Sequence, residues 1–378
     1  MGSTSSPDEL DAAYDPHSIR NGKLFAAEVF WRDHYQFLKD HGYILRPRYH
    51  PDWVASWLGT SKDWTECEDG VAMSTGQVLD ATRADGSLVI LKRINTSRFP
   101  QEITVGRHLS SEPLASNPRN RCVPILDVIQ PPEGAETAFV VMPFLFESEF
   151  VPFETVGEAV EFFRQLFQGL QFMHENNVVH GDCKYDNIMA DLGGLFDSPP
   201  HPCWPRMKRD FTGRTPKPAS RTTRPVKYYL VDFNLSQIYR PEDAPHVKTP
   251  PWGGDQTVPE FSIPGAPPCD PFRVDVYCLG NAIRENFLDG WENMVKPKQG
   301  FEFMRELISD MTNKDPLKRP TMDEVVSRFD DIIKRLSAKK LRSPVLKVGE
   351  IPGMFRFIVH WSKQTSYTAR RLPPIPRA

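Results

Sequence analysis

Residues 178–189 read VVHGDCKYDNIM, and this stretch decides how the rest of the chain is interpreted. An apolar pair leads into it and another leads out of it. Between them stand a carboxylate, a cation two residues later and an amide five residues later, which are Asp182, Lys184 and Asn187. Phosphoryl transfer needs a group that orients the attacking hydroxyl, positive charge near the moving phosphoryl group and oxygen ligands for Mg²⁺. One short loop here supplies all three.

The residues around this loop predict helices. Just before it, Thr155 and Glu158 form a capping box, and apolar residues recur at helical spacing from there to Met173. Beyond residue 190, helical periodicity dominates again and is interrupted by loops. Because Asp and Asn are also common turn formers, the combination of residues carries the interpretation and no single residue does.

Further toward the N-terminus the pattern becomes strand-like. A hairpin is predicted over 70–95 with Gly86 at its turn, and shorter strands are predicted at 123–129 and 138–143. A small strand-rich part therefore precedes a large helical part. The fold class predicted from this order is α+β.

The first 62 residues form an N-terminal extension. One helix is predicted from about residue 21 to residue 40, with Gly42 just past its end. Trp53, Trp57 and Trp64 follow and need apolar partners, so this segment is expected to lie against the next domain.

Composition excludes several classes of protein. The 378 residues are 39% hydrophobic and 25% charged, and the net charge of -3 argues against nucleic acid as the main partner. No apolar run is long enough to span a membrane, and the N-terminus lacks a signal-peptide core. The six cysteines are scattered without a C-x-x-C pair, which is typical of reduced thiols in an intracellular protein, cytoplasmic or nuclear.

Six motifs in one order resemble the eukaryotic protein kinase family, serine/threonine type, over about residues 65–335. The surrounding pattern also resembles kinase-like proteins of filamentous fungi. The resemblance implies a bilobal fold with a small antiparallel-sheet N-lobe and a large, mostly helical C-lobe. The motifs, in chain order, are VILK at 89–92, H-x-D-x-K-x-x-N at 180–187, YYLVDFN at 228–234, VPE at 258–260, DVYCLG at 275–280 and DPLKRPT at 315–321.

The resemblance also implies roles for the residues of the loop. Asp182 would accept or orient the proton of the substrate hydroxyl, and Lys184 would stabilise charge on the transferring phosphate. Asn187 and Asp232 would hold Mg²⁺ through the hard oxygen ligands that this ion prefers.

A second set of residues is implied to bind ATP. Lys92 would hold the α and β phosphates, oriented by the carboxylate of Glu102, although these two residues are close in sequence for the family. Gly76, Val78 and Met142 complete the predicted nucleotide-binding residues.

Three further residues are implied to be structural. Glu260 and Arg319 are expected to form a buried ion pair in the large lobe. Asp275 is expected to fix the backbone of the catalytic loop from beneath.

The phosphate-binding loop departs from the family pattern. The three positions of its glycines are held by Val71, Met73 and Gly76, so only the last glycine survives. Side chains there should hinder the approach of backbone N–H groups to phosphate. Gly70 would compensate only if the loop were shifted by one residue.

Two other departures are milder. Gly181 replaces the arginine that typically reads a phosphorylated activation loop, which argues against that form of switching. Asn234 replaces a glycine that is free to adopt positive φ, and asparagine is among the residues that tolerate such a φ best.

Two segments lie outside the family pattern. About 35 extra residues, roughly 191–226, are rich in Pro, Ser, Thr and basic residues; they form either a solvated loop or a dock for an acidic or phosphorylated partner. His201 and Cys203 lie in this insert, but two ligands are too few to form a zinc site. The basic tail ends in an R-x-x-P-x-x-P pattern at 370–376, which suits an SH3-type partner or is simply a solvated end.

These observations divide the chain into an extension at 1–62, a protein-kinase-like domain at 63–337 and a basic, proline-ended tail at 338–378. The predicted function is ATP-dependent phosphoryl transfer to serine or threonine of a protein substrate. A pseudokinase that binds nucleotide or acts as a scaffold is the alternative, because the glycine-rich loop is eroded. A small-molecule phosphotransferase fits Gly181 but not Lys184 or the motifs at 258–260 and 315–321.

Overall fold

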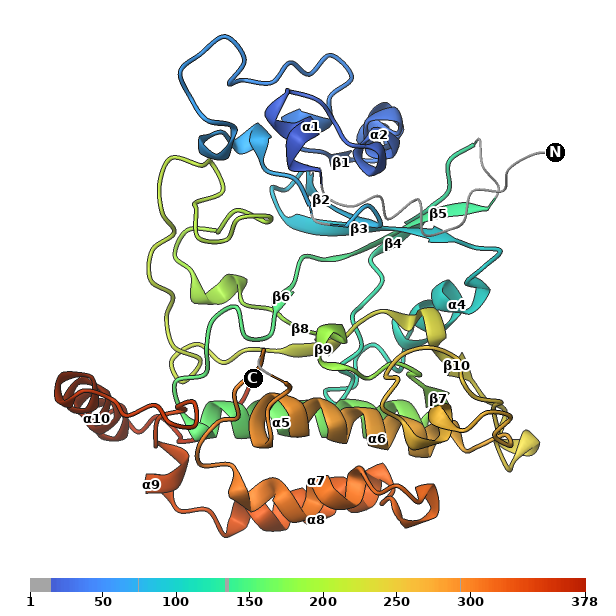
Figure 1. Ribbon diagram of the computed structural model, residues 1–378, viewed down its shortest axis with the longest axis vertical. Helices are drawn as coiled ribbons and strands as arrows, with labels where there is room; N and C mark the ends of the chain where they lie inside the picture. Colours follow the sequence, from blue (N-terminus) through green and yellow to red (C-terminus); the bar gives the residue numbers. More distant parts are fainter. Residues whose placement is uncertain (1–14, 74, 133–135, 293) are drawn as a thin grey trace. The chain divides into compact units, whose positions relative to one another are not determined.

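The computed structural model describes residues 15–73, 75–132, 136–292 and 294–378 (Figure 1). The chain divides into two units, which are described separately. Unit 1 comprises Met1–Pro100, Pro124–Leu145 and Phe196–Lys217, and unit 2 comprises Gln101–Val123, Phe146–Leu195 and Pro218–Ala378. The boundaries predicted at residues 62 and 337 stay predictions.

Unit 1 is built on a five-stranded antiparallel sheet with the strand order β1-β2-β3-β5-β4. The β2–β3 hairpin closes at Gly86, whose φ of 83° is readily adopted by glycine. The predicted hairpin and the two shorter strands are confirmed in type, with shifted ends. The strands are β1 (Tyr43–Ile44), β2 (Val78–Arg83), β3 (Leu88–Asn95), β4 (Asp127–Ile129) and β5 (Thr137–Pro143).

The prediction of one helix in the extension is wrong. The described part of the extension has three helices: α1 (Pro16–Arg20), α2 (Ala26–Asp33) and α3 (Tyr35–Asp40). The helix α2 begins late because the Glu28 carboxylate accepts a hydrogen bond from the Phe25 amide at 3.1 Å, which caps the helix there. His34, with ψ near 5°, separates α2 from α3.

Two apolar clusters hold the extension in unit 1. The helices α2 and α3 place Trp31, Tyr35 and Leu38 against side chains of the sheet such as Phe139. The three later tryptophans, which were expected to lie against the next domain, pack in a separate cluster from that of the sheet. They join a second cluster with residues of the first helices, which consists of Ile19, Phe25, Ala27, Trp53, Ala55, Trp57, Trp64, Cys67 and Ala72.

Part of the predicted insert is folded into unit 1 and is not a solvated loop. His201 is fully buried and its ring nitrogen lies 3.2 Å from a Glu68 oxygen. Arg46 bridges Asp80 on β2, at 3.0 Å, and the Cys203 thiol, also at 3.0 Å. Arg46 thus fills the space between these groups, and no cluster of three or more His, Cys, Asp or Glu side chains suited to a metal is found in the described residues.

Unit 2 is largely helical, so the chain is a mixed α+β protein, which agrees with the predicted bilobal fold. Its helices are α4 (Pro100–Leu109), α5 (Val156–Glu175), α6 (Pro271–Ile283), α7 (Arg305–Met311), α8 (Met322–Lys334), α9 (Ala338–Leu341) and α10 (Met354–Ala369). Its short strands are β6 (Phe146–Glu147), β7 (Val178–Val179), β8 (Ile188–Ala190), β9 (Tyr228–Leu230) and β10 (Gln237–Ile238). Among the described residues, no helix has the length and apolar character needed to cross a membrane.

The central helix of unit 2 is α5. Phe162, Phe163 and Phe167 on this helix are fully buried, and the last two meet Phe287 and Phe329 edge to face. Half of the predicted capping box is present, because the Thr155 hydroxyl accepts from the Glu158 amide at 3.2 Å.

The Glu158 carboxylate does not close the box on Thr155. It accepts from the Glu154 amide at 2.7 Å and from Thr222 at 3.0 Å, so it also holds the end of the insert. Arg221, in the same part of the insert, is buried and donates to the Ser148 carbonyl at 2.8 Å. This end of the insert belongs to the interior of unit 2.

The C-terminal tail folds back onto unit 2. Arg342 donates to the Leu372 carbonyl at 2.6 Å, Pro376 is buried, and the Pro374 carbonyl lies against Gly157 of α5. The tail borders a groove of about 590 Å³, whose other side is formed by Thr222, Thr223 and Pro225. The SH3-type partner stays a prediction, and it would have to displace the tail from this position.

Candidate active site

Three short strands position the predicted catalytic loop in unit 2. The strand β8 pairs antiparallel with β9, with Ile188 opposite Leu230, and the Val231 amide donates to the Asn187 carbonyl at 3.0 Å. Asn187 precedes β8 and Asp232 follows β9, so both residues stand at the same end of the strand pair. The two sequence motifs therefore meet at the backbone, and the shared magnesium site stays a prediction.

Asp275 fixes the backbone of this loop, as expected. Its carboxylate is fully buried on α6 and accepts from the His180 amide at 2.7 Å and from the Gly181 amide at 2.8 Å. The His174 ring lies 3.1 Å from the same carboxylate. Because two backbone donors depend on one side chain, Asp275 sets the direction of the chain entering Asp182.

The two oxygens of the Asp182 carboxylate differ in their contacts: one is hydrogen-bonded and the other has no hydrogen-bond partner among the described residues. Its Oδ2 accepts from Asn187 Nδ2 at 2.8 Å and lies 3.2 Å from Lys184 Nζ. Its Oδ1 is buried without a hydrogen-bond partner in the described part of the chain, and the residue is 4% exposed. Burial raises the pKa of this carboxyl above its ordinary value, and the neighbouring ammonium of Lys184 opposes the shift.

Asn187 is oriented so that its amide oxygen remains available. Both of its side-chain hydrogen bonds are made by Nδ2, to the Asp182 carboxylate and, at 3.0 Å, to the Asp182 carbonyl. Its Oδ1 accepts no hydrogen bond from the described residues. An oriented amide oxygen beside a carboxylate is the donor chemistry that Mg²⁺ takes.

Two glycines permit close packing around Asp182. Gly181 has φ of 83°, and a Cβ there would lie 2.5 Å from the Leu235 carbonyl oxygen. This explains why no arginine can stand at this position without a shift of the backbone. Gly254 has φ of 76°, and a Cβ there would lie 2.9 Å from Asp182 Oδ1.

The segment around Gly254 was missed by the sequence analysis. It is fixed by Asp255, whose carboxylate accepts from Asn281 on α6 at 2.8 Å, and by the Tyr277 hydroxyl, which donates to the Thr257 carbonyl at 2.9 Å. The only signal in the sequence is the pair of adjacent glycines before Asp255.

The positive φ near the metal-binding motif lies on a different residue from the one expected. Asp232 has φ of 68° and ψ of 78°, whereas Asn234 lies in a short 3-10 helix at Phe233–Leu235. The turn comes directly after β9, so it falls on Asp232. A non-glycine residue in this region costs on the order of 1–3 kcal/mol, which the surrounding structure must supply. Such strain is frequent at functional sites.

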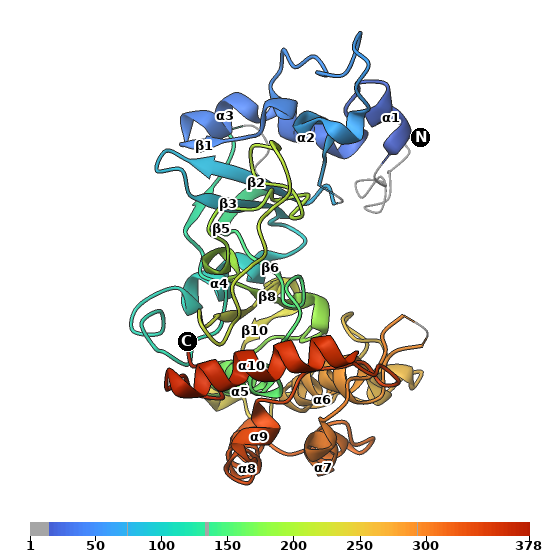
Figure 2. The same ribbon diagram turned by 90° about the vertical axis from the view of Figure 1, so that its left-hand side faces the viewer.

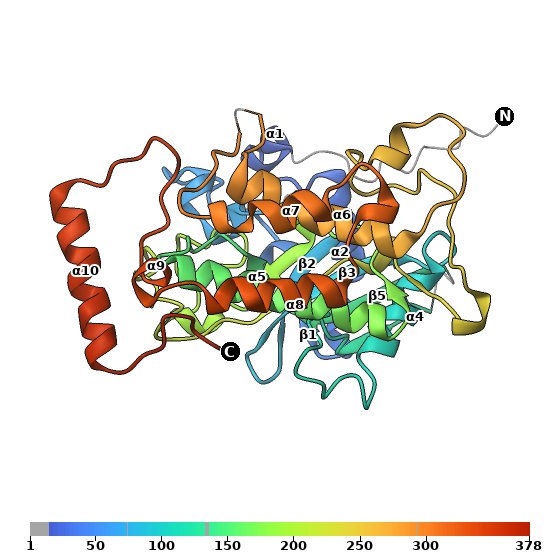
Figure 3. The same cartoon turned by 90° about the horizontal axis from the view of Figure 1, so that it is seen from below.

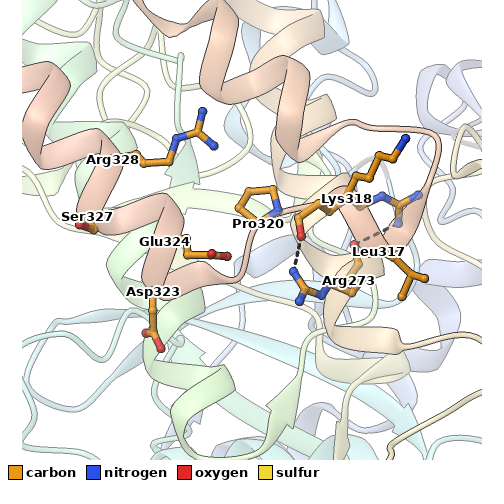
Figure 4. Close-up of a pocket in the computed structure, with 9 residues that line it drawn as sticks. Arg273, Leu317, Lys318, Pro320, Asp323, Glu324, Ser327 and Arg328 are labelled. Atoms are coloured by element: carbon orange, nitrogen blue, oxygen red, sulfur yellow. Dashed lines mark hydrogen bonds between the residues drawn. The ribbon is translucent and has the colours of Figure 1, made fainter.

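The predicted buried ion pair is confirmed. Both Arg319 terminal nitrogens donate to the Glu260 carboxylate, at 2.8 and 2.6 Å, and Arg319 is 1% exposed. This arginine borders a groove of about 580 Å³ that is also lined by Arg273 of α6, by the loop before α8 and by α8 itself; Figure 4 shows the residues that line it. None of the predicted catalytic residues lines this groove.

The residues predicted to bind ATP lie on well-defined elements. Lys92 on β3 and Glu102 on α4 are both largely buried, at 9% and 6% exposed, and their pairing stays a prediction. Val78 on β2 stands opposite Lys92 in the sheet, and Met142 on β5 stands opposite Ile90.

The eroded phosphate loop is tied into unit 1. The carbonyl of Gly76 accepts from the Trp31 indole at 3.0 Å. A Cβ on Gly70 would lie 1.9 Å from the Trp64 carbonyl oxygen, so packing against Trp64 explains this glycine. Val71 is buried, and Ser74 lies outside the described residues.

Comparison with known proteins gives one partial similarity. NUAK family SNF1-like kinase 2 of Rattus norvegicus is 25% identical to the chain over 128 residues, which are 32% of this chain and 20% of that protein. The chain thus covers about a fifth of the length of that kinase. No family model matches the chain. The similarity indicates a protein kinase-like protein.

Proposed function

We propose that the chain is an Mg²⁺-assisted, ATP-dependent protein serine/threonine kinase. The observation that carries the proposal is the arrangement at Asp182: one carboxylate oxygen held by Asn187 and Lys184, the other buried and unpartnered, on a loop whose backbone is fixed by Asp275. A structural aspartate would have both oxygens satisfied. A base that receives a substrate hydroxyl needs one oxygen free for it.

In this proposal the residues divide the work by their chemistry. Asp182 orients the acceptor hydroxyl and takes its proton, while Lys184, 43% exposed at its side chain, places positive charge beside it. Asn187 and Asp232 would hold Mg²⁺, which would neutralise charge on the phosphates of ATP. Lys92, Glu102, Gly76, Val78 and Met142 are proposed as nucleotide contacts.

Two observations favour the alternative, a pseudokinase that binds nucleotide or acts as a scaffold. The positions of the first two phosphate-loop glycines are Val71, which is buried, and Met73, which packs against the cluster of the sheet. In addition, Asp182 is almost fully covered, with Gly254 in close contact. Catalysis would require this segment to expose the carboxylate.

The test is transfer of radiolabelled phosphate from ATP, with Mg²⁺, to general acceptors such as casein and myelin basic protein. Asp182→Asn and Asp232→Asn are expected to lower the rate by a factor of about 10² or more. Asp186→Asn is the matched control, because Asp186 is an exposed carboxylate in the same loop. Analysis of the labelled amino acids should find phosphoserine and phosphothreonine.

Each result has one meaning. Activity that survives in both variants would overturn the proposed site. Absence of activity in the wild type, together with thermal stabilisation by Mg–ATP, would favour the pseudokinase. Absence of both would remove nucleotide chemistry from the proposal.

A further inference from the structure

The chain between residues 348 and 359 exposes an unusual concentration of large apolar side chains. No other stretch of this length in the described residues has more than two that are strongly exposed. Monomeric proteins rarely leave such a group in water unless it binds something. The seven residues, with their exposed fractions, are Val348 (54%), Ile351 (91%), Met354 (80%), Phe355 (81%), Phe357 (52%), Ile358 (54%) and Val359 (48%).

The contacts that attach α10 to unit 2 begin at His360, whose ring nitrogen lies 2.9 Å from the Arg342 carbonyl oxygen. Gln364 and Tyr367 are buried, the Tyr367 hydroxyl lies 2.9 Å from the Ser220 hydroxyl, and Lys363 pairs with Glu154 at 2.7 Å. The exposed stretch 354–359 precedes these contacts, and α10 lies along the outside of unit 2 in Figures 2 and 3. Its apolar residues are therefore not a displaced part of the core.

The exposed apolar band is wide. At about 100° per residue, the five apolar residues between Met354 and Val359 span about 200° of the helix circumference. The residues that face unit 2, such as Gln364 and Tyr367, occupy the remaining side. A helix that docks into a protein groove usually presents a narrower stripe, on the order of 100°. A band of this width suits an apolar medium that contacts the helix from several directions.

The tail that contains this segment carries an excess of positive charge. Residues 338–378 contain nine Lys and Arg residues and a single acid, Glu350, although the whole chain has a net charge of -3. Five of these cations are exposed and have no carboxylate within 4.0 Å among the described residues: Lys339, Lys347, Arg370, Arg371 and Arg377. A second copy of the chain would bring these like charges together, which opposes self-association through this face.

We propose that residues 348–359 form a membrane-surface contact that takes anionic lipid, with the apolar side chains entering the headgroup boundary and the basic residues on either side meeting lipid phosphates and carboxylates. Apolar and cationic groups together are what interfacial binding requires, since either alone binds weakly. This contact is independent of phosphoryl transfer. It would place unit 2 at a lipid surface without a membrane-spanning segment.

The test is co-sedimentation of the full chain with vesicles of phosphatidylcholine alone or of phosphatidylcholine with phosphatidylserine. The wild type is expected to bind the phosphatidylserine vesicles and to be released by salt. The double variant Phe355→Ser/Ile358→Ser should lose at least about tenfold in partitioning. Lys339→Gln/Lys347→Gln should lose about fivefold for each charge removed, and only on the anionic vesicles.

Leu317→Ser is the control, because Leu317 is 86% exposed elsewhere in unit 2 and should partition as the wild type does. The altered residues are exposed, so each variant is expected to unfold at the wild-type temperature. Equal binding to both kinds of vesicle, or unchanged binding after Phe355→Ser/Ile358→Ser, would overturn the proposal. So would a dimer that this double variant dissociates in the absence of any vesicle binding, which would assign the surface to a second copy.

Discussion

Two loops of this protein differ in how closely they resemble the protein kinase sequence pattern. The loop at 178–189 in unit 2 has its backbone fixed by Asp275 and retains each residue type that phosphoryl transfer needs. The loop at 70–77 in unit 1 has glycine at only one of the three positions where the family pattern has it. One of its remaining backbone acceptors, at Gly76, is used by Trp31 of the extension.

The difference shows that different interactions restrict which residues the two loops can contain. The first loop is held by buried hydrogen bonds inside unit 2, where a lost partner leaves unsatisfied polar groups. The second loop contacts helices that are absent from the family pattern, so its residues serve packing against those helices as well as any ligand. The proposed catalytic residues can thus keep the family pattern while the predicted phosphate loop departs from it.

The largest expected effect is on the stability of unit 2, at the buried ion pair of Arg319 and Glu260. Replacing Arg319 by Met leaves the Glu260 carboxylate buried without its two donors, and breaking such a pair costs about 3–5 kcal/mol of unfolding free energy. Chemical denaturation measures this loss. Arg305→Met is the control, because its pair with Asp289 is about half exposed and should be worth less than about 1 kcal/mol. A loss at Arg319 no greater than at Arg305 would contradict the prediction.

Next in size is the effect of crowding Asp182. Gly254→Ala forces a left-handed φ on alanine and places a Cβ 2.9 Å from Asp182 Oδ1, so it should cost about 2–3 kcal/mol and lower any transferase activity at least tenfold. Gly59→Ala is matched in conformation, since Gly59 has φ of 74° and open space around it. It should cost about 1 kcal/mol and leave activity unchanged. Equal effects of the two variants would mean that contact with Asp182 plays no part.

Sequence patterns predicted the parts of the molecule whose interactions are fixed by short motifs. The roles of Asp275 and of the Glu260–Arg319 pair followed from motifs whose chemistry repeats wherever they occur. Three features depend on partners that are far away in the sequence, so the local pattern does not predict them. They are the break at His34, the packing of Trp53 and the burial of Arg221. Gly254 was missed because a glycine pair is also an ordinary turn.

A smaller effect separates function from stability at Asp182. Burial raises the pKa of this carboxyl, so its ionised form costs folding free energy at any pH above that raised pKa. Asp182→Asn should therefore lower the proposed transfer by a factor of about 10² or more and yet stabilise the protein at pH 7, by about 1 kcal/mol. The gain should shrink as the pH falls toward the ordinary Asp pKa of 3.8, where the wild-type carboxyl is protonated and the cost is absent. Thermal unfolding of both proteins from pH 7 to pH 4 measures this, and a variant less stable than the wild type at pH 7 would contradict it.

The smallest expected effect addresses the eroded loop itself. If the side chains at the former glycine positions keep backbone N–H groups away from phosphate, Met73→Gly should tighten binding of Mg–ATP by about two- to fivefold. It should also cost some stability, because Met73 packs against the cluster of the sheet. Met73→Ala is the matched control: it removes the same packing but leaves the backbone restricted, so its affinity should stay near that of the wild type. Calorimetric titration compares the three proteins. Equal affinity in the glycine and alanine variants would show that backbone freedom at this position does not limit nucleotide binding, and the contrast between the two loops would then need another cause.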